Sequence, residues 1–180
     1  MIDSFAWVLP RPSKTKYQGS FPLHFEKKLL NLLNIDITKH KILHPFGGKA
    51  QYGIRCDVCI DVEPDYICDA HSLPFDDNYF DLVILDPPYD NNYSENLYGT
   101  GFIKLNFKKY TDEAVRVCKP LGYVVVYHYL ATPSIKDSKL VKRIFLETRP
   151  WHKLRCVHIY KKFPPIPPNN KLLGILGGIL

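Results

Sequence analysis

The chain has 180 residues, of which 46% are hydrophobic and 13% aromatic, and a formal net charge of +6. This length and composition are typical of one globular domain with a substantial core. No stretch approaches the ~20 apolar residues of a membrane span, and the N-terminus lacks the charged start and apolar stretch of a secretory signal. Five cysteines, an odd number, favour reduced thiols, so we expect a cytoplasmic protein with no membrane partner.

The first half of the chain predicts short elements separated by turns. After a polar loop, apolar residues at helical spacing predict a helix over 23–33. Short strands are expected at 41–43, 55–60 and 66–68, and a longer apolar run at 80–85 is typical of a buried parallel strand. The connections between the first three strands are shorter than an ordinary parallel crossover of ~10–12 residues. Some crossover helices must therefore be reduced or absent.

The second half predicts a helix and three further strands. The helix is expected over 107–118 and ends at Lys119-Pro120-Leu121-Gly122, which is a stop signal. Strands are expected at 123–129, 140–146 and 154–160, and the alternation of the last one suits antiparallel pairing.

Strands that alternate with turns and helices in this order predict an α/β fold. We expect one mostly parallel sheet with a carboxyl-terminal antiparallel strand, in a single domain over residues 1–162. Residues 163–180 form a proline-rich linker and a short apolar tail, which favours self-association or a partner subunit.

Charge is segregated along the sequence. Residues 56–95 contain eleven Asp or Glu and no Lys or Arg, whereas residues 136–162 contain nine Lys or Arg and two acids. Basic flanks suit a phosphate backbone, and an acidic centre suits a cationic ligand. The alternative is that the lysines only solubilise the surface.

A rigid turn follows the apolar run at 80–85. Its sequence is Asp86-Pro87-Pro88-Tyr89, and the two prolines prevent both further strand and an immediate helix. In open α/β sheets this carboxyl end of a strand is where ligands bind. The Asp86 carboxylate and the Pro87 carbonyl can accept the two hydrogens of an exocyclic amine, and Tyr89 can stack on a flat base. The alternative is a turn that merely ends a strand.

Three other predicted strand ends carry residues that suit a nucleoside ligand. The first is followed by Phe46-Gly47-Gly48, where glycine lets the backbone approach a ligand. The second ends at Asp61, and an acid there can accept both hydroxyls of a ribose. The third ends at Asp69-Ala70, and Leu73-Pro74-Phe75 can wall a flat ring. Each feature alone also fits an ordinary loop.

Taken in order, these motifs resemble those of the class I S-adenosylmethionine-dependent methyltransferases that act on amino groups, especially on adenine N6 in DNA. Residues 44–50, His-Pro-Phe-Gly-Gly-Lys-Ala, are similar to the family's Asp-Pro-Phe-x-Gly-Ser-Gly cofactor motif, and Asp86 to Tyr89 to its catalytic motif. The resemblance implies a Rossmann-like fold, S-adenosylmethionine as cofactor and nucleic acid as partner. It implies these cofactor-binding residues: Pro45, Phe46, Gly47, Gly48, Asp61, Asp69, Ala70 and Asp86. It implies these catalytic residues: Asp86, Pro87, Pro88 and Tyr89.

Three positions depart from the cofactor motif. His44 replaces an acid, Lys49 replaces a small hydroxyl residue, and Ala50 replaces a glycine. Lys49 brings a cation toward a cationic cofactor, and Ala50 is disfavoured if the turn requires a positive φ.

The target is less specified than the reaction. Similar enzymes that carry Asp at the first motif position act on adenine N6, so the resemblance favours adenine N6 in DNA, while adenine N6 or guanine N2 in RNA stays open. A second class of function is a non-catalytic nucleic-acid-binding subunit of a heteromeric methyltransferase, and a third is a methyltransferase acting on small molecules or proteins. Cys56 and Cys59 form a Cys-x-x-Cys, but no second pair at metal-binding spacing accompanies it, so no metal site is predicted.

Overall fold

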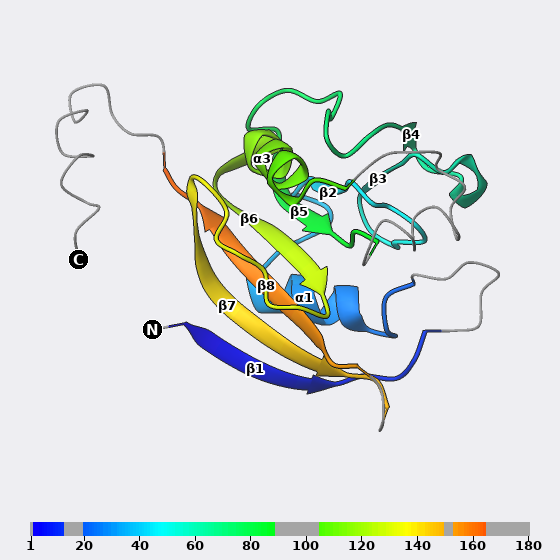
Figure 1. Ribbon diagram of the computed structural model, residues 1–180, viewed down its shortest axis with the longest axis vertical. Helices are drawn as coiled ribbons and strands as arrows, with labels where there is room; N and C mark the ends of the chain where they lie inside the picture. The colour runs from blue at the N-terminus through cyan, green and yellow to red at the C-terminus, as the bar shows by residue number, and fades with distance from the viewer. Residues whose placement is uncertain (1, 13–19, 89–104, 150–152, 165–180) are drawn as a thin grey trace, which may run out of the picture.

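The computed structural model describes residues 2–12, 20–88, 105–149 and 153–164. Within them, strands form one sheet in the order β1-β7-β8-β6-β5-β2-β3-β4 (Figure 1). The strands are β1 (Asp3–Val8), β2 (Ile42–His44), β3 (Ile54–Asp57), β4 (Tyr66–Ile67), β5 (Phe80–Leu85), β6 (Cys118–His128), β7 (Ser138–Glu147) and β8 (Arg155–Lys162). The helical segments are α1 (Phe25–Leu33), the 3-10 helix η1 (Ile60–Val62) and α3 (Phe107–Val117).

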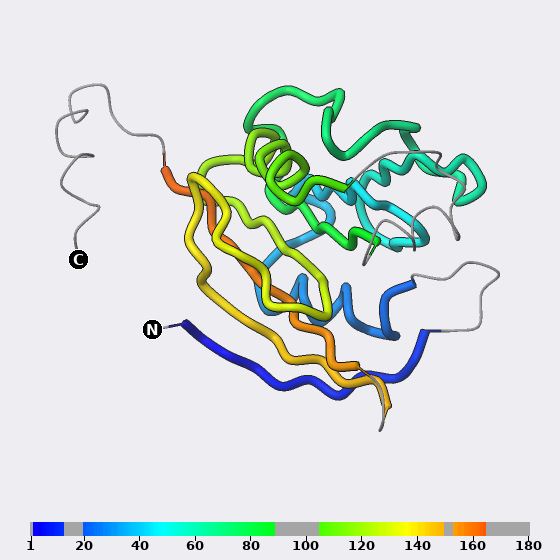
Figure 2. Tube along the Cα trace, in the orientation of Figure 1, coloured from blue at the N-terminus to red at the C-terminus, as the bar shows by residue number. Residues whose placement is uncertain are grey.

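The directions of the strands confirm the predicted fold class. Strands β4, β3, β2, β5 and β6 pair in parallel with one another in this order. Strand β8 runs antiparallel to both β6 and β7. Strand β1 pairs in parallel with β7, so the amino-terminal segment lies beside a strand near the other end of the sequence (Figure 2).

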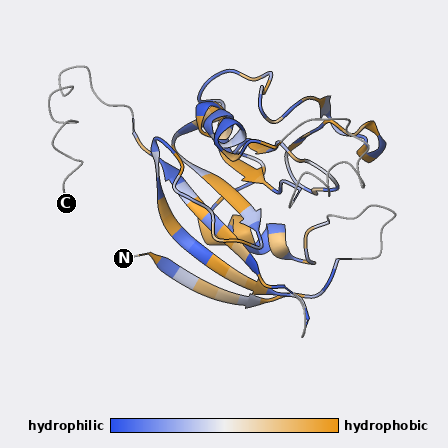
Figure 3. Cartoon of the chain, viewed as in Figure 1, coloured by the Kyte–Doolittle hydropathy of each residue, from blue (hydrophilic) through white to orange (hydrophobic). Residues whose placement is uncertain are grey.

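Alternate residues of the central strands face two separate cores. In β5, Leu82 and Ile84 pack with α1, while Val83 and Leu85 pack with α3. The two helices therefore cover opposite faces of the sheet (Figure 1), and apolar residues concentrate on the strands between them (Figure 3). A strand buried on both faces reads as a continuous apolar run, which is why β5 is found where predicted.

The predicted loss of crossover helices is confirmed where the chain is described. Residues 45–53, between β2 and β3, and residues 68–79, between β4 and β5, contain no helix. The connection from β3 to β4 contains only the single turn of η1. In the described part of the chain, no helix is long and apolar enough to cross a membrane.

Strand β3 is shorter than the predicted strand over 55–60. It ends at Asp57, whose carboxylate accepts a hydrogen bond from the Cys59 amide at 3.0 Å. An aspartate that bonds to the backbone two residues later forms a local turn that competes with the strand ladder.

Helix α3 ends at Val117, as the predicted stop requires, but β6 begins at Cys118 rather than at 123, so residues 119–122 form a bulge within β6. Phe80 pairs with Cys118 but Leu82 pairs with Tyr123, so the extra residues lie between these pairs. Leu121 adopts φ 64°, and a Cβ on Gly122 would lie 2.8 Å from the Asp81 carbonyl oxygen. The turn residues therefore bend the strand without ending it.

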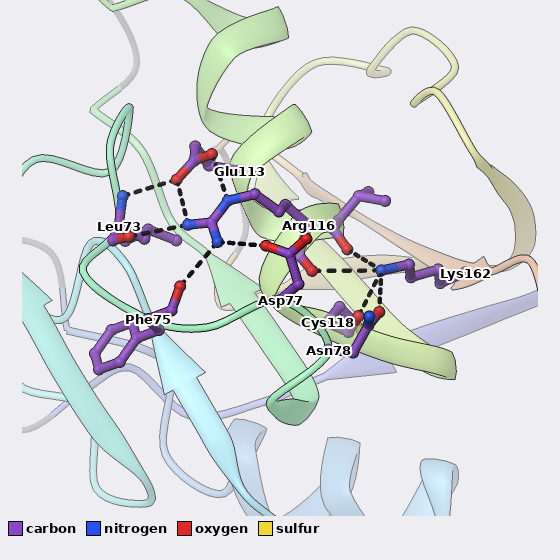
Figure 4. A network of polar contacts seen from close by, with 9 residues as sticks. Leu73, Phe75, Asp77, Asn78, Glu113, Arg116, Cys118 and Lys162 are labelled. Atoms are coloured by element: carbon purple, nitrogen blue, oxygen red, sulfur yellow. Dashed lines mark hydrogen bonds and ion pairs between the residues drawn. The ribbon is translucent and has the colours of Figure 1, made fainter. Parts of the chain in front are cut away.

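Lys162 of β8 terminates α3 from outside the helix. Its Nζ donates hydrogen bonds to the carbonyls of Val115 at 2.6 Å and Cys118 at 2.7 Å, and to Oδ1 of Asn78 at 2.8 Å (Figure 4). Burial lowers the pKa of this amine. The last carbonyls of a helix lack intrahelical partners, so this lysine satisfies acceptors that water reaches poorly.

Replacing Lys162 with Met should lower the free energy of unfolding by about 1–3 kcal/mol, because it leaves these acceptors without a donor. Urea unfolding of the variant measures the loss. The matched control is Lys139→Met, which removes an exposed lysine from β7 and should leave stability nearly unchanged. Equal effects of the two substitutions would contradict the capping role.

Candidate active site

The chain reverses its course through the sheet at β2. From β2 it moves to β3 and β4 on one side, and then returns to β5 and β6 on the other. Ligands of open α/β sheets bind outside the carboxyl ends of the strands at such a switch point. Leu43 pairs with Val83, so Phe46 and Asp86 each lie three residues beyond a paired position. The glycine turn and the Asp86 turn therefore leave neighbouring strands at the same edge of the sheet.

The glycine turn is held against β3. The Gly47 amide donates to the Cys56 carbonyl at 2.7 Å, and the Gly48 amide donates to the Asp57 carboxylate at 3.1 Å. A Cβ on Gly47 would lie 2.6 Å from the Cβ of Arg55, and Gly48 adopts φ 43°. Both positions therefore require glycine, the first for space and the second for its backbone conformation. Pro45 is buried directly before this turn.

Two of the three departures from the cofactor motif, Lys49 and Ala50, fit within the glycine turn. Lys49 Nζ donates to the Val62 carbonyl at 3.1 Å and lies 3.9 Å from the Glu63 carboxylate, so its cation is directed toward η1. Ala50 donates its amide to the Gly47 carbonyl at 2.9 Å and is not among the described residues with positive φ. Neither substitution prevents the turn from forming.

The acid at the carboxyl end of β3 is Asp57 rather than Asp61. Asp61 lies in η1 and is exposed. Asp57 ends the strand, and its two carboxylate oxygens accept the amides of Gly48 and Cys59. The sequence places both acids within five residues, and only the strand boundary distinguishes them. Because the strand was predicted to extend to residue 60, Asp57 was not identified from the sequence as the acid at its end.

Asp69 is oriented by a histidine that the sequence reading did not single out. Oδ1 of Asp69 lies 2.7 Å from Nδ1 of His71 and accepts the His71 amide at 2.9 Å. Nε2 of His71 accepts the Asn106 amide at 3.0 Å, immediately before α3. One neutral tautomer satisfies both contacts, with the proton on Nδ1. His71 thus joins Asp69 to the start of α3, and Ala70 between them is buried.

The segment after Asp69 is fixed to α3 by Arg116. Its guanidinium donates to the carbonyls of Leu73 and Phe75 at 2.9 and 2.8 Å (Figure 4). It also donates to the carboxylates of Glu113 and Asp77 at 2.8 Å. These bonds hold an irregular connection in place where a helix would otherwise do so, and Leu73 is buried within it.

Asp86 lies at the end of β5 in a poorly hydrated environment. Burial raises the pKa of its carboxyl to about 8, against the opposing effect of the Arg155 charge. Pro87 is buried and Pro88 is partly exposed, while Tyr89 lies outside the described residues. A carboxyl with a raised pKa beside a Gly-rich turn is a candidate for chemistry.

The arrangement brings a glycine turn and three carboxyl side chains to one edge of the sheet. Gly47, Gly48, Asp57 and Asp69 lie at the ends of β2, β3 and β4, and Asp86 lies at the end of β5. In the described residues, no group of three His, Cys, Asp or Glu side chains is placed to hold a metal ion. Cys56 and Cys59 are both free thiols.

Replacing Asp86 with Asn should change how stability depends on pH. The pKa of the unfolded carboxyl is near its ordinary value of 3.8, whereas the pKa of the folded one is about 8. The folded protein therefore binds more protons between these values, and the contribution of Asp86 to stability, present at low pH, is lost as pH rises to about 8.

Urea unfolding of both proteins from pH 5 to 8 tests this. The wild-type protein should lose stability relative to the variant as pH rises. A difference that stays constant over this range would contradict a neutral Asp86 carboxyl in the folded protein.

Comparison with solved structures identifies similar folds. TrmN from Thermus thermophilus gives a TM-score of 0.56 at 16% identity, over 81% of this chain and 50% of TrmN, so the chain spans about half its length. YhhF from Escherichia coli, assigned as a methyltransferase, gives 0.52 at 12% identity over 87% of this chain and 92% of YhhF. MccD gives 0.53 at 12% identity over 78% and 97% of the two chains.

No model of a known protein family matches the sequence, and no curated protein matches it. Identities of 12–16% establish likeness of fold. The single mixed sheet of this chain, with its antiparallel carboxyl-terminal strands, agrees with that fold. The chain has the Rossmann-like fold of the class I methyltransferases.

Proposed function

We propose that this protein is an S-adenosylmethionine-dependent methyltransferase that acts on an exocyclic amino group of a nucleic-acid base, with adenine N6 in DNA as the favoured target. The observation that carries the proposal is the direct pairing of β2 with β5, which puts the glycine turn and Asp86 at one edge of the sheet. The fold alone supports a methyltransferase, and the Asp-Pro-Pro-Tyr sequence supports an amino group as the acceptor.

The residues at the strand ends fit the cofactor. S-adenosylmethionine, when bound, supplies a methyl group activated by a sulfonium cation. Gly47 and Gly48 leave room for a close approach of the backbone, and Asp57 offers a carboxylate for ribose hydroxyls. Asp69, oriented by His71, is an acceptor for the adenine amino group. Because Lys49 is directed toward Val62 and Glu63, it does not oppose a cation at the turn.

Asp86 and Pro87 act on the substrate amine. The lone pair of an exocyclic amine is delocalised into the base ring. The Asp86 carboxyl and the Pro87 carbonyl accept hydrogen bonds from the two N–H groups of this amine. The nitrogen then moves toward tetrahedral geometry and its lone pair becomes available. Positioning and local electrostatics then provide most of the rate. Asp86 ionises more readily beside a cation, which opposes the effect of burial on its pKa.

The nucleic-acid target rests on the sequence of the motif and on charge. A base inside a duplex cannot reach a carboxyl at the sheet edge, so a target in DNA would be extruded, with Tyr89 as the stacking residue. The basic residues of β7 and β8 suit a phosphate backbone. The apolar tail over 172–180, for which we proposed self-association, lies outside the described residues.

Replacing Asp86 with Ala should lower methyl transfer by about 100-fold or more, because the amine loses its main acceptor. The measurement is transfer of labelled methyl to DNA and RNA, with mass spectrometry of the nucleosides, and calorimetry with S-adenosylhomocysteine. Binding should change by less than about threefold. The matched control is Asp76→Asn, at an exposed acid of the 68–79 connection.

The nucleosides decide the target. N6-methyldeoxyadenosine supports the favoured assignment, and N6-methyladenosine or N2-methylguanosine from RNA replaces it. Binding of cofactor without any methylated nucleoside supports a non-catalytic subunit instead. Equal loss of transfer and binding in the Asp86 variant contradicts the division of roles.

Replacing Asp57 with Asn should weaken S-adenosylhomocysteine binding by about tenfold or more, because a charge-assisted hydrogen bond to the ribose is lost. The Asp61→Asn variant should bind within about twofold of wild type, since Asp61 lies in η1. Titration calorimetry measures both, and thermal unfolding checks that the Asp57 variant is folded. A larger loss at Asp61 would restore the residue that the sequence predicted.

A further inference from the structure

A buried acid contacts the connection that contains the glycine turn, although it belongs to a different element. Glu26 is in the first turn of α1 and is only 6% exposed. Both oxygens of its carboxylate accept the Gln51 amide at 3.1 Å. Burial raises its pKa, and hydrogen bonds from the backbone of Gln51 and Tyr52 oppose that effect. Glu26 thus contacts the connection from β2 to β3, which contains the glycine turn.

The residue at the end of β2 that faces this acid is His44. It is 1% exposed, and neither ring nitrogen has a hydrogen-bond partner. Its Nε2 lies 3.7 Å from Oε1 of Glu26. Burial lowers the pKa of His44 to about 4, so the ring is neutral at neutral pH. The Tyr52 backbone raises this pKa and the Arg55 charge lowers it, and both effects are smaller than that of burial.

The packing of the turn alone does not explain why Glu26 and His44 are buried side by side. A neutral glutamine at position 26 could accept the Gln51 amide equally well, with a smaller desolvation cost than a carboxylate. Arg55 does not compensate this charge, because its guanidinium donates to the carbonyls of Gly48, Val62 and Glu63. A buried carboxylate beside a polar ring without hydrogen-bond partners therefore suits the binding of a cationic group.

The proposed cofactor carries such a group. The methionine part of S-adenosylmethionine ends in an ammonium and a carboxylate, and a buried ammonium requires an acceptor, best a charged one. The motif that this chain resembles has an acid where His44 stands, and a neutral imidazole cannot supply a negative charge. The nearby carboxylate of Glu26 comes from a different element.

We propose that Glu26 of α1 is a cofactor-binding residue that holds the ammonium group of S-adenosylmethionine, in place of the acid that position 44 lacks. The inference rests on the proposed use of this cofactor and adds to it a residue outside the motifs. His44 fills the end of β2 beside Glu26 without competing for the cation. The negative charge at the turn is thus moved from the strand to the helix.

Calorimetry with two ligands tests the assignment. S-adenosylhomocysteine carries the ammonium, and 5′-methylthioadenosine has the same nucleoside without it. The Glu26→Gln variant, which keeps an acceptor for the Gln51 amide, should bind S-adenosylhomocysteine about tenfold or more weakly and methylthioadenosine within about twofold. Adding His44→Asp to this variant should restore much of the binding of S-adenosylhomocysteine. The matched control is Asp76→Asn, at an exposed acid of the 68–79 connection.

Other outcomes overturn the inference. Equal weakening of both ligands shows that Glu26 only positions the turn, and unchanged binding of both shows that it has no role in affinity. If the wild-type protein binds neither ligand, the proposed function fails as well, which separates the two failures.

A measurement on the wild-type protein covers the case of a variant that does not fold. In protein with ¹³C-labelled glutamate, the Glu26 carboxyl resonance should shift with S-adenosylhomocysteine and not with methylthioadenosine. The same shift with both ligands contradicts the contact.

Discussion

The candidate site depends on the direct parallel pairing of β2 with β5. Two strands that are adjacent in the sheet but separated in the sequence by β3 and β4 end side by side, and each continues into a turn that cannot extend the sheet. On the β2 side the backbone needs glycine at positions 47 and 48, and on the β5 side two prolines set its course. The chemistry that we propose requires both turns at one edge. It would be lost by any change in the order of these strands.

The short connections of this chain change what holds the site together. Hydrogen bonds between charged side chains and the backbone fix the loops and the end of α3. Asp57 holds the glycine turn, Arg116 holds residues 73–77, and Lys162 closes α3. Such contacts cost desolvation and lock one geometry more strictly than apolar packing does. The residues that stabilise the fold therefore also set the positions of the candidate ligand-binding residues.

The sequence predicted best what local pattern determines. Strand β5 and helix α3 were predicted nearly to the residue, because a strand buried on both faces is continuously apolar and an amphipathic helix repeats at a fixed period. Strand β1 was not predicted, since its pairing with β7 joins residues that are distant in the sequence, such as Asp3 and Lys142. The end of β3 was misplaced because the Asp57 side chain bonds to its own backbone. The proximity of Glu26 to His44 follows from the packing of α1 beneath the sheet, which no spacing in the sequence encodes.

The central claim is that one pocket at the ends of β2 and β5 holds both the cofactor and the acceptor carboxyl. A crystal structure of the protein with S-adenosylhomocysteine tests it most directly. The account predicts the ligand against Gly47 and Gly48, with its sulfur directed toward Asp86. A ligand bound at another edge of the sheet, or one whose sulfur points away from Asp86, would contradict it.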